Sequence, residues 1–247
     1  MQSNDLRRRQ QYGLTTDAVV LHCPGPLRRR DNPVHVEWEQ AQLSFFADAS
    51  LGKSFQDDPR LTVITYNASG RESLLERCGA HLGITVVVLG RTVRDWSWEH
   101  KITLVRDYLE SAEPAENVMC LDAFDTLILD GPQMILERFH ATSAEILFGC
   151  TATDWPPSRE HERFEADVYR DASWAHRHLN ASYIGKTAEV RRCLEQIVHG
   201  IEAGEPWCRT DTGFDDQLAW REMHRQRHPC LKIDVNCSIF VRFDEDR

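Results

Sequence analysis

The chain has 247 residues, of which 41% are hydrophobic and 28% are charged, and its formal net charge is -10. These values are typical of a globular protein with one large domain. The negative charge argues against a general nucleic-acid-binding protein, which needs a basic face. Basic runs occur at 7–9 and 28–30, in a poorly patterned N-terminal segment. No apolar run reaches the roughly 20 residues that span a bilayer, so no membrane span is predicted.

Three further features favour a reducing, cytoplasmic environment. The N-terminal segment MQSNDLRRRQQYG has no apolar core behind its charges, unlike a signal peptide. The eight cysteines are scattered without a C-x-x-C pair, so we interpret them as reduced core residues rather than as a disulfide framework or a zinc site. Asn-x-Ser sequons, which are glycosylation signals in secreted proteins, occur at Asn67, Asn180 and Asn236. Two of them fall in segments that are assigned below to the active site, where a glycan would not fit.

In chain order, the first regular patterns lie within the otherwise irregular segment 1–60. Residues 18–22 are typical of a strand, and residues 36–46 are typical of an amphipathic helix. From residue 61 the pattern sharpens, because β-branched apolar runs alternate with segments whose apolar residues have helical spacing. Strands are expected at 61–66, 84–89, 146–150 and in the run 118–129, and helices at 71–82, 100–109 and 132–140.

The second half of the chain is less regular. We expect a lid or acceptor loop at 158–174, a short strand or turn at 178–185, a helix at 186–203, and a last helix that opens at 211–220. The alternation of strands and helices predicts an α/β protein, in which a Rossmann-like, mostly parallel sheet carries helices on both faces. We expect residues 1–60 to be an N-terminal extension, packed on or preceding a core domain at 61–247.

Two carboxylates, Asp122 and Asp125, interrupt the apolar run 118–129. Unpaired buried charges are costly, so these side chains need water, a cation or a hydrogen-bonding partner. Mg²⁺ and Mn²⁺ prefer oxygen ligands, and a paired acidic turn can hold such a cation against phosphates. Ligands bind at the carboxyl ends of parallel strands, where Thr65 would also lie. The alternative is that the two acids only cap the helix or turn that follows.

An ordered series of short motifs resembles the glycosyltransferase domain of the procollagen lysyl hydroxylases. The resemblance covers roughly residues 61–240. The motifs are VITY at 63–66, VVVLG at 86–90, Trp96, Lys101, LDAFD at 121–125, ILFG at 146–149, WP at 155–156, HLNASYIG at 178–185 and DDQL at 215–218. This resemblance implies a GT-A fold and transfer of a sugar from a UDP-sugar with Mn²⁺, or with Mg²⁺ in its place.

The resemblance also implies roles for individual residues. Asp122 and Asp125 would bind the metal and the donor diphosphate, and Lys101 would lie near that diphosphate. The other residues assigned to donor binding are Thr65, Trp96, Phe124 and Trp155. Asn180, Asp215 and Asp216 would lie near the donor sugar and the acceptor. Simpler alternatives remain: Asp215 and Asp216 suit the first turn of a helix, Asn180 suits a turn, and Trp155 suits a packing anchor.

The sequence departs from the family pattern at three places. The family completes its metal site with a histidine in a His-Gly segment beyond the last strand, and no such segment follows here. The family has small residues after the asparagine that matches Asn180, and this chain has Ala181-Ser182 there. Thr151 stands where the family has an acid. One hypothesis is that a substitute third ligand comes from His176, His178, His224, His228, Asp244 or Asp246. The alternative is that the histidines near Arg221, Arg225 and Arg227 belong to a solvated basic face.

These observations predict a cytoplasmic, metal-dependent hexosyltransferase. It would move a sugar from a nucleotide-sugar, UDP-linked in the main interpretation, to a hydroxyl-type acceptor on a peptide, metabolite or natural-product scaffold, without a nucleic-acid or membrane partner. The alternative is a catalytically silent nucleotide-sugar-binding module that acts with a partner, which the missing histidine favours. A nucleotidyltransferase or phosphohydrolase ranks last, because its usual phosphate loop is absent.

Overall fold

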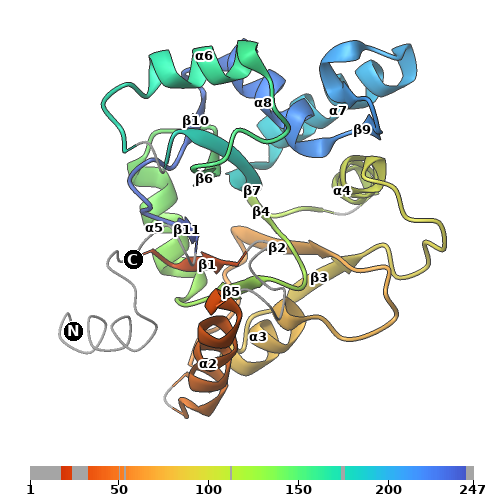
Figure 1. The fold of residues 1–247 in the computed structure, drawn as a ribbon. Coiled ribbons are helices and arrows are strands. Elements are labelled where there is room, and N and C mark those ends of the chain that lie inside the picture. Colours follow the sequence, from red (N-terminus) through yellow and green to blue (C-terminus); the bar gives the residue numbers. More distant parts are fainter. Residues whose placement is uncertain are drawn as a thin grey trace.

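The structure of the chain is a computed structural model that describes residues 18–23, 33–49, 51–52, 54–111, 113–173 and 176–242. Figure 1 shows the arrangement of its elements. The helices are α2 (Pro33–Ala47), α3 (Leu74–Leu82), α4 (Glu99–Ser111), α5 (Pro132–Ala141), α6 (Arg159–Val168), α7 (Thr187–Ala203) and α8 (Asp216–Arg227), with a 3-10 turn at Pro206–Cys208. None of the helices in these ranges is both long and apolar enough to cross a membrane.

The strands form one large sheet and two small ones. The strands are β1 (Val20–His22), β2 (Leu61–Tyr66), β3 (Val86–Leu89), β4 (Asn117–Leu121), β5 (Thr126–Ile128), β6 (Ile146–Thr151), β7 (His178–Lys186), β8 (Arg209–Thr210), β9 (Gly213–Phe214), β10 (Leu231–Ile233) and β11 (Phe240–Arg242). The large sheet has the order β10-β6-β7-β4-β2-β3, and only β7 runs antiparallel to its neighbours. This confirms the predicted α/β class and the mostly parallel, Rossmann-like sheet.

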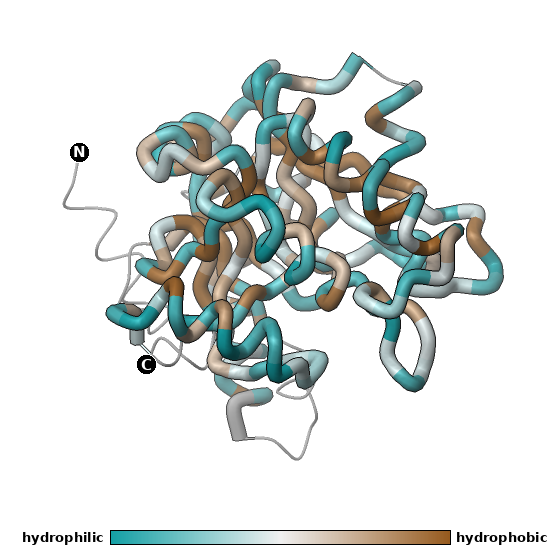
Figure 2. Tube along the Cα trace, turned by 90° about the horizontal axis from the view of Figure 1, so that it is seen from above, coloured by the Kyte–Doolittle hydropathy of each residue, from teal (hydrophilic) through white to brown (hydrophobic). Residues whose placement is uncertain are grey.

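The central strands are buried because their sequences are almost continuously apolar, as expected for a sheet that is covered on both faces. All five side chains of β4 are buried, and so are all six of β6. Figure 1 shows α4, α7 and α8 on one side of the sheet and α3 and α5 on the other. Figure 2 shows the same layering as hydrophobic segments in the middle of the molecule and hydrophilic ones around them.

The first described strand joins a small sheet beside the acidic turn. β1 pairs in parallel with β11 and antiparallel with β5, so the order is β11-β1-β5. His22 lies opposite Thr126, and the backbone N–H of Cys23 donates to the carbonyl of Asp125 at 2.7 Å. The strand from segment 1–60 therefore lies directly against the turn that carries the two acids. The division of the chain into an N-terminal extension at 1–60 and a core domain at 61–247 stays a prediction.

The prediction of a loop at 158–174 is wrong, because Arg159–Val168 forms the helix α6. The sequence does not indicate this helix, because ion pairs rather than apolar residues pack it against its neighbour. Glu165 is fully buried and its carboxylate receives two hydrogen bonds from the buried guanidinium of Arg221, at 2.9 and 2.8 Å. Apolar periodicity, the usual signal of a packed helix, is consequently missing.

Several predicted features lie outside the described residues. They are the basic runs 7–9 and 28–30, most of the turn at 23–26, and the two C-terminal acids Asp244 and Asp246.

Candidate active site

Three side chains converge where β4 ends and β5 begins. Asp122 and Asp125 lie in the turn between these strands, and His22 approaches from the end of β1. The Nε2 atom of His22 is 3.8 Å from an oxygen of Asp122 and 3.6 Å from an oxygen of Asp125. One ligand atom from each residue lies within 4.8 Å of the other two, so the three side chains could hold one metal ion.

His22 is buried, and neither ring nitrogen makes a hydrogen bond to the described residues. An orphaned buried polar group costs free energy unless an unseen partner satisfies it. Burial by itself lowers the pKa of His22, but the carboxylates of Asp125 and Asp122 outweigh it and leave this pKa raised above 6.5. A proton or a metal ion is the partner that this position calls for, and one imidazole with two carboxylates suits Mn²⁺ or Mg²⁺.

The sequence prediction missed His22. It sought a third ligand among His176, His178, His224 and His228, but the structure engages three of these elsewhere. His178 bonds Glu165 at 2.7 Å, His224 bonds the hydroxyl of Tyr169 at 2.8 Å, and His176 lies against Cys237. The sequence did contain a signal for this residue. The apolar run before His22 is typical of a strand, His22 ends it directly before Cys-Pro-Gly-Pro, and site residues often lie at the ends of strands.

Lys101 connects the two acidic motifs. Its Nζ atom lies 2.9 Å from Asp122 and 3.2 Å from Asp216, at the start of α8. Burial acts to lower the pKa of Lys101, but these two carboxylates more than reverse it, so its pKa is raised and the side chain stays charged. Burial raises the pKa of Asp216, against the opposing effect of Lys101. The lysine thus holds a fixed positive charge beside the candidate metal position.

A cavity of about 600 Å³ opens over this cluster. We call it the donor cavity; it is lined by Tyr66, Ala68, Ser69, Arg94, Trp96, Trp98, Lys101, Asp122, Ala123, Phe124 and Asp125. Phe124 is 42% exposed and Trp98 is 53% exposed, so their rings are available for stacking. The sequence prediction had named five of these residues: Trp96, Lys101, Asp122, Phe124 and Asp125. It missed Tyr66 at the end of β2, Ser69 in the loop after β2, and Arg94 and Trp98 in the loop after β3.

Thr65 is not among the residues that line this cavity, and its predicted contact with the nucleotide stays a prediction. Its side chain is fully buried and its hydroxyl donates to the carbonyl of Leu121 at 2.8 Å. The reason is the alternation of side chains along a strand, which turns Thr65 into the sheet and the next residue, Tyr66, toward the cavity. The hydroxyl instead ties β2 to β4 directly before Asp122.

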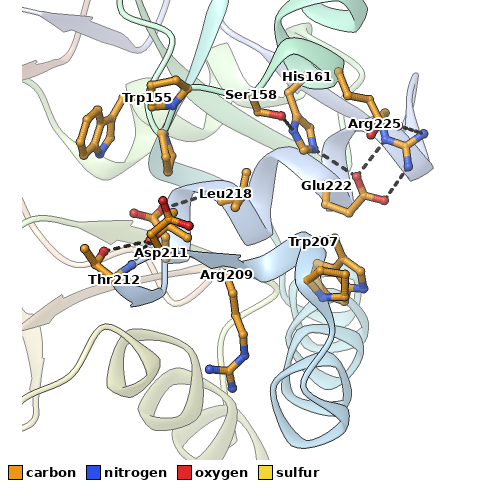
Figure 3. Close-up of a pocket in the computed structure, with 16 residues that line it drawn as sticks. Trp155, Ser158, His161, Trp207, Arg209, Asp211, Thr212, Leu218, Glu222 and Arg225 are labelled. Atoms are coloured by element: carbon orange, nitrogen blue, oxygen red, sulfur yellow. Dashed lines mark hydrogen bonds and ion pairs between the residues drawn. The ribbon is translucent and has the colours of Figure 1, made fainter.

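A second cavity of about 850 Å³, shown in Figure 3, lies against α8, and we call it the acceptor cavity after the acceptor that the sequence analysis expects near the segment 158–174. Its lining includes Trp155, Trp207, Asp211, Asp215 and Arg225. Figure 3 shows Trp155 and Trp207 on opposite sides of this cavity. Trp155 is 59% exposed and lines this cavity rather than the donor cavity, and its assignment to donor binding stays a prediction.

The two adjacent acids at the start of α8 have different partners. Asp215 lines the acceptor cavity and caps the helix, because its carboxylate accepts from the N–H of Leu218 at 2.9 Å. Its neighbour Asp216 bonds Lys101 of the donor cavity. Burial raises the pKa of Asp215, and the nearby charge of Asp216 adds to this. The helix-capping alternative is therefore observed for Asp215, together with its position at the cavity wall.

Asn180 lies apart from both cavity linings. It is opposite Gly149 where the pairing of β6 and β7 shifts register, and its side-chain oxygen accepts from the N–H of Ser182 at 3.0 Å. Asn180 therefore makes its local contact within β7, at an irregularity of the strand pairing, rather than in a separate turn. Thr151, where the family has an acid, receives a hydrogen bond from Arg242 of β11.

Comparisons with known proteins agree with this geometry. A family model described as the PLOD GT domain matches residues 58–246. The human procollagen-lysine,2-oxoglutarate 5-dioxygenase 2 is 24% identical over 212 residues, which cover 78% of this chain and 26% of the relative. The mouse protein of the same name is 25% identical over 196 residues, covering 73% and 24%. The chain thus spans about a quarter of the length of these relatives.

Proposed function

Because the chain belongs to the PLOD GT domain family, we propose that it is a metal-dependent glycosyltransferase that uses a nucleotide-sugar donor, with UDP-sugar as the first candidate. The observation that carries this proposal is the convergence of His22, Asp122 and Asp125 beneath a cavity walled by aromatic rings. A nucleotide-sugar combines a flat base, a diphosphate and a sugar. The donor cavity offers a partner for each of the first two.

The base would stack on exposed aromatic rings at the rim. Phe124 lies next to the acidic turn, and Trp96 and Trp98 lie in the loop that follows β3. Trp96 already stacks on His100, with ring centroids 5.5 Å apart, which fixes the orientation of that indole. A preorganised ring loses little conformational entropy when it binds a base.

The diphosphate would lie over the carboxylate–histidine cluster. Asp122, Asp125 and His22 would hold Mn²⁺ or Mg²⁺, which neutralises the phosphates and stabilises the charge of the departing nucleotide. Arg94 lines the same cavity and offers a further positive charge to the phosphates.

Lys101 would act on the charge that develops when the sugar–phosphate bond breaks. Its ammonium is already positioned by Asp122 and Asp216, so it needs no rearrangement during the reaction. A preorganised cation of this kind stabilises the departing nucleoside diphosphate more than the intact nucleotide-sugar, because one further negative charge develops on the diphosphate as the bond breaks. Asp216 thereby acts as a positioning residue for Lys101.

The acceptor would approach through the acceptor cavity, on the side of Asp215. Tryptophan rings pack well against the apolar faces of a sugar or of an acceptor scaffold, and Trp155 and Trp207 provide them. Asp215 is the wall carboxylate nearest in sequence to the donor-side network, so it is the candidate to receive or orient an acceptor hydroxyl. The peptide, metabolite or natural-product nature of that acceptor stays a proposal, as does a cytoplasmic location.

The alternative of a silent nucleotide-sugar-binding module loses its main support with His22, because a third ligand is available after all. The two proposals differ in turnover. The purified protein is incubated with UDP- and GDP-sugars, with and without Mn²⁺, while nucleotide binding and nucleotide release are measured separately. Metal-dependent release supports the transferase, and metal-dependent binding without release on any acceptor supports the silent module.

The matched variants are Asp122→Asn/Asp125→Asn and the control Asp107→Asn. Asp107 is an exposed acid of α4 that pairs only locally with Arg106. Nucleotide binding should be lost in the double variant and kept in the control. No metal-dependent nucleotide binding by the wild-type protein would overturn both proposals.

A further inference from the structure

We propose that Cys150, His176 and Cys237 form a second metal site, which binds zinc and fixes the C-terminal strand to the main sheet. Each residue supplies one ligand atom, and these atoms all lie within 4.8 Å of one another. The sequence prediction interpreted the cysteines as reduced core residues, because they are scattered without a C-x-x-C pair. The two thiols are 87 positions apart in the chain. Only the fold brings them together.

Two of the three edges of the cluster are close to those of a tetrahedral zinc site. The sulfur atoms of Cys150 and Cys237 are 3.6 Å apart, and the Cys237 sulfur is 3.6 Å from either ring nitrogen of His176. With Zn–S bonds of about 2.3 Å and Zn–N bonds of about 2.0 Å, a tetrahedron has S···S and S···N edges of about 3.8 and 3.5 Å. The third edge, between Cys150 and His176, lies within 4.8 Å, so a zinc ion would draw these two residues together.

A backbone carbonyl determines the tautomer in which the His176 imidazole could bind a metal. Its Nδ1 atom lies 3.2 Å from the carbonyl oxygen of Val235, a contact that an N–H donor at this nitrogen satisfies. Metal-binding histidines characteristically donate one ring N–H to a backbone carbonyl, which leaves the other nitrogen unprotonated for the metal. In this tautomer the Nε2 atom of His176 is the nitrogen offered to the ion.

The loop that carries Cys237 is built around one carboxylate. Asp234 accepts from the N–H groups of Ser238, Ile239 and Phe240 at 2.7 to 2.9 Å. Cys237 itself has φ of 49°, a left-handed conformation that non-glycine residues rarely adopt. The loop thus holds its cysteine in a specific orientation toward β6.

The chemistry of the cluster separates it from the candidate active site. Two thiolates and an imidazole prefer zinc, whereas the two carboxylates and imidazole around His22 suit Mn²⁺ or Mg²⁺. Cys150 and Cys237 are buried, and His176 is half-buried. Water is the expected fourth ligand, and it would enter on the side of the histidine.

The position in the fold indicates what the zinc would do. Cys150 lies on β6, His176 precedes β7, and Cys237 precedes β11. β11 pairs with β1, whose last residue is His22. A zinc ion at the cluster would therefore anchor the strand pair that presents His22 to the acidic turn. This role in positioning His22 rests on the proposed function, whereas zinc binding itself does not.

The test is the metal content of the protein purified under reducing conditions without a metal-affinity tag. We expect one equivalent of zinc in the wild-type protein, and loss of at least nine-tenths of it in Cys237→Ser and in Cys150→Ser. Cys230→Ser is the matched control, because Cys230 is exposed and outside the cluster, and it should keep its zinc. Asp122→Asn/Asp125→Asn should keep it as well, so that failure of the active-site proposal is distinguishable from failure of this one.

A spectroscopic measurement keeps the proposal falsifiable if a serine variant does not fold. Wild-type protein loaded with Co²⁺ should show thiolate-to-cobalt charge-transfer absorption and the visible bands of a tetrahedral ion, and added Zn²⁺ should abolish both. Zinc-free protein whose Co²⁺ complex lacks these bands would overturn the proposal. A Cys150–Cys237 disulfide in protein that was never exposed to an oxidant, detected by peptide mass, would overturn it too.

Discussion

The two side-chain clusters of this protein are similar in size and opposite in chemistry. The cluster of His22, Asp122 and Asp125 is rich in oxygen and lies beneath the donor cavity. The cluster of Cys150, His176 and Cys237 is rich in sulfur and lies where the C-terminal loop meets β6. Carboxylates and an imidazole favour a hard ion such as Mn²⁺ or Mg²⁺ that can also bind phosphates, whereas two thiolates and an imidazole favour zinc. The comparison teaches that ligand type, rather than the mere convergence of three ligands, decides which metal each cluster favours.

The largest expected effect comes from removing the oxygen ligands. In Asp122→Asn/Asp125→Asn, metal-dependent nucleotide release should fall by about a thousandfold or more, because the leaving diphosphate loses its metal. Release of UDP in the presence of Mn²⁺ measures this effect. A double variant that retains wild-type rates would show that the acidic turn is only a cap, and that the contrast between the two clusters is wrong.

Lys101→Met tests the fixed charge between the two acidic motifs. Nucleotide release should fall by about a hundredfold, as expected for loss of one preorganised group that stabilises a developing anion. Nucleotide affinity, measured by calorimetry, should change much less. Lys186→Met serves as the control, because Lys186 makes a similar 2.9 Å pair with Glu145 at an exposed place away from the site. Equal losses in affinity and rate would instead assign Lys101 to ground-state binding.

His22→Ala tests whether a strand from outside the matched family region completes the metal site. We expect Mn²⁺ affinity to fall by roughly ten- to a hundredfold, because one of three protein ligands is lost. Titration followed by the electron paramagnetic resonance of free Mn²⁺ measures this directly, without any turnover. His199→Ala, at an exposed position of α7, should leave affinity unchanged. Unaltered Mn²⁺ binding in His22→Ala would mean that the acids recruit another ligand.

His224 offers a further comparison with the histidines of the two clusters, because it is buried but belongs to neither cluster. Burial lowers the pKa of His224 from 6.5 to about 3. Between these values the unfolded chain binds a proton that the folded chain lacks, so the free energy of unfolding falls as pH falls below 6.5. At pH 5 this loss amounts to about 2 kcal/mol.

Urea unfolding of wild type and His224→Gln at several pH values measures this effect as a difference in slope. The variant should lose less stability than the wild type between pH 6.5 and 5, whatever its stability at neutral pH. The exposed residue in His199→Gln should give the wild-type slope. Parallel slopes for all three proteins would contradict the assignment of a neutral, buried imidazole.

Local patterns carried much of the fold. The strand at Leu61–Tyr66 was predicted at its observed bounds, and the helices α4, α5 and α7 at nearly theirs, because apolar spacing reports which side chains face a shared core. Helix α6 was missed because its buried positions are His161 and Glu165, which pair with Glu222 and Arg221 of α8. A helix that is held by ion pairs to another helix leaves no apolar signature of its own.

The candidate active site also combines features that local patterns predict with features that depend on contacts between distant parts of the chain. Local sequence patterns placed Asp122 and Asp125 at a strand end and indicated the α/β class, because both depend on residues close together in the chain. Lys101, Trp96 and Phe124 were named from the family resemblance instead. Tertiary structure decided that Thr65 turns inward, that Trp155 belongs to the neighbouring cavity, and that His22 and the thiols of Cys150 and Cys237 converge. These positions depend on pairing between strands far apart in sequence, β1 with β5 and β11 above all. Long-range pairing is set by the packing of the whole sheet, and no local pattern of residues encodes it.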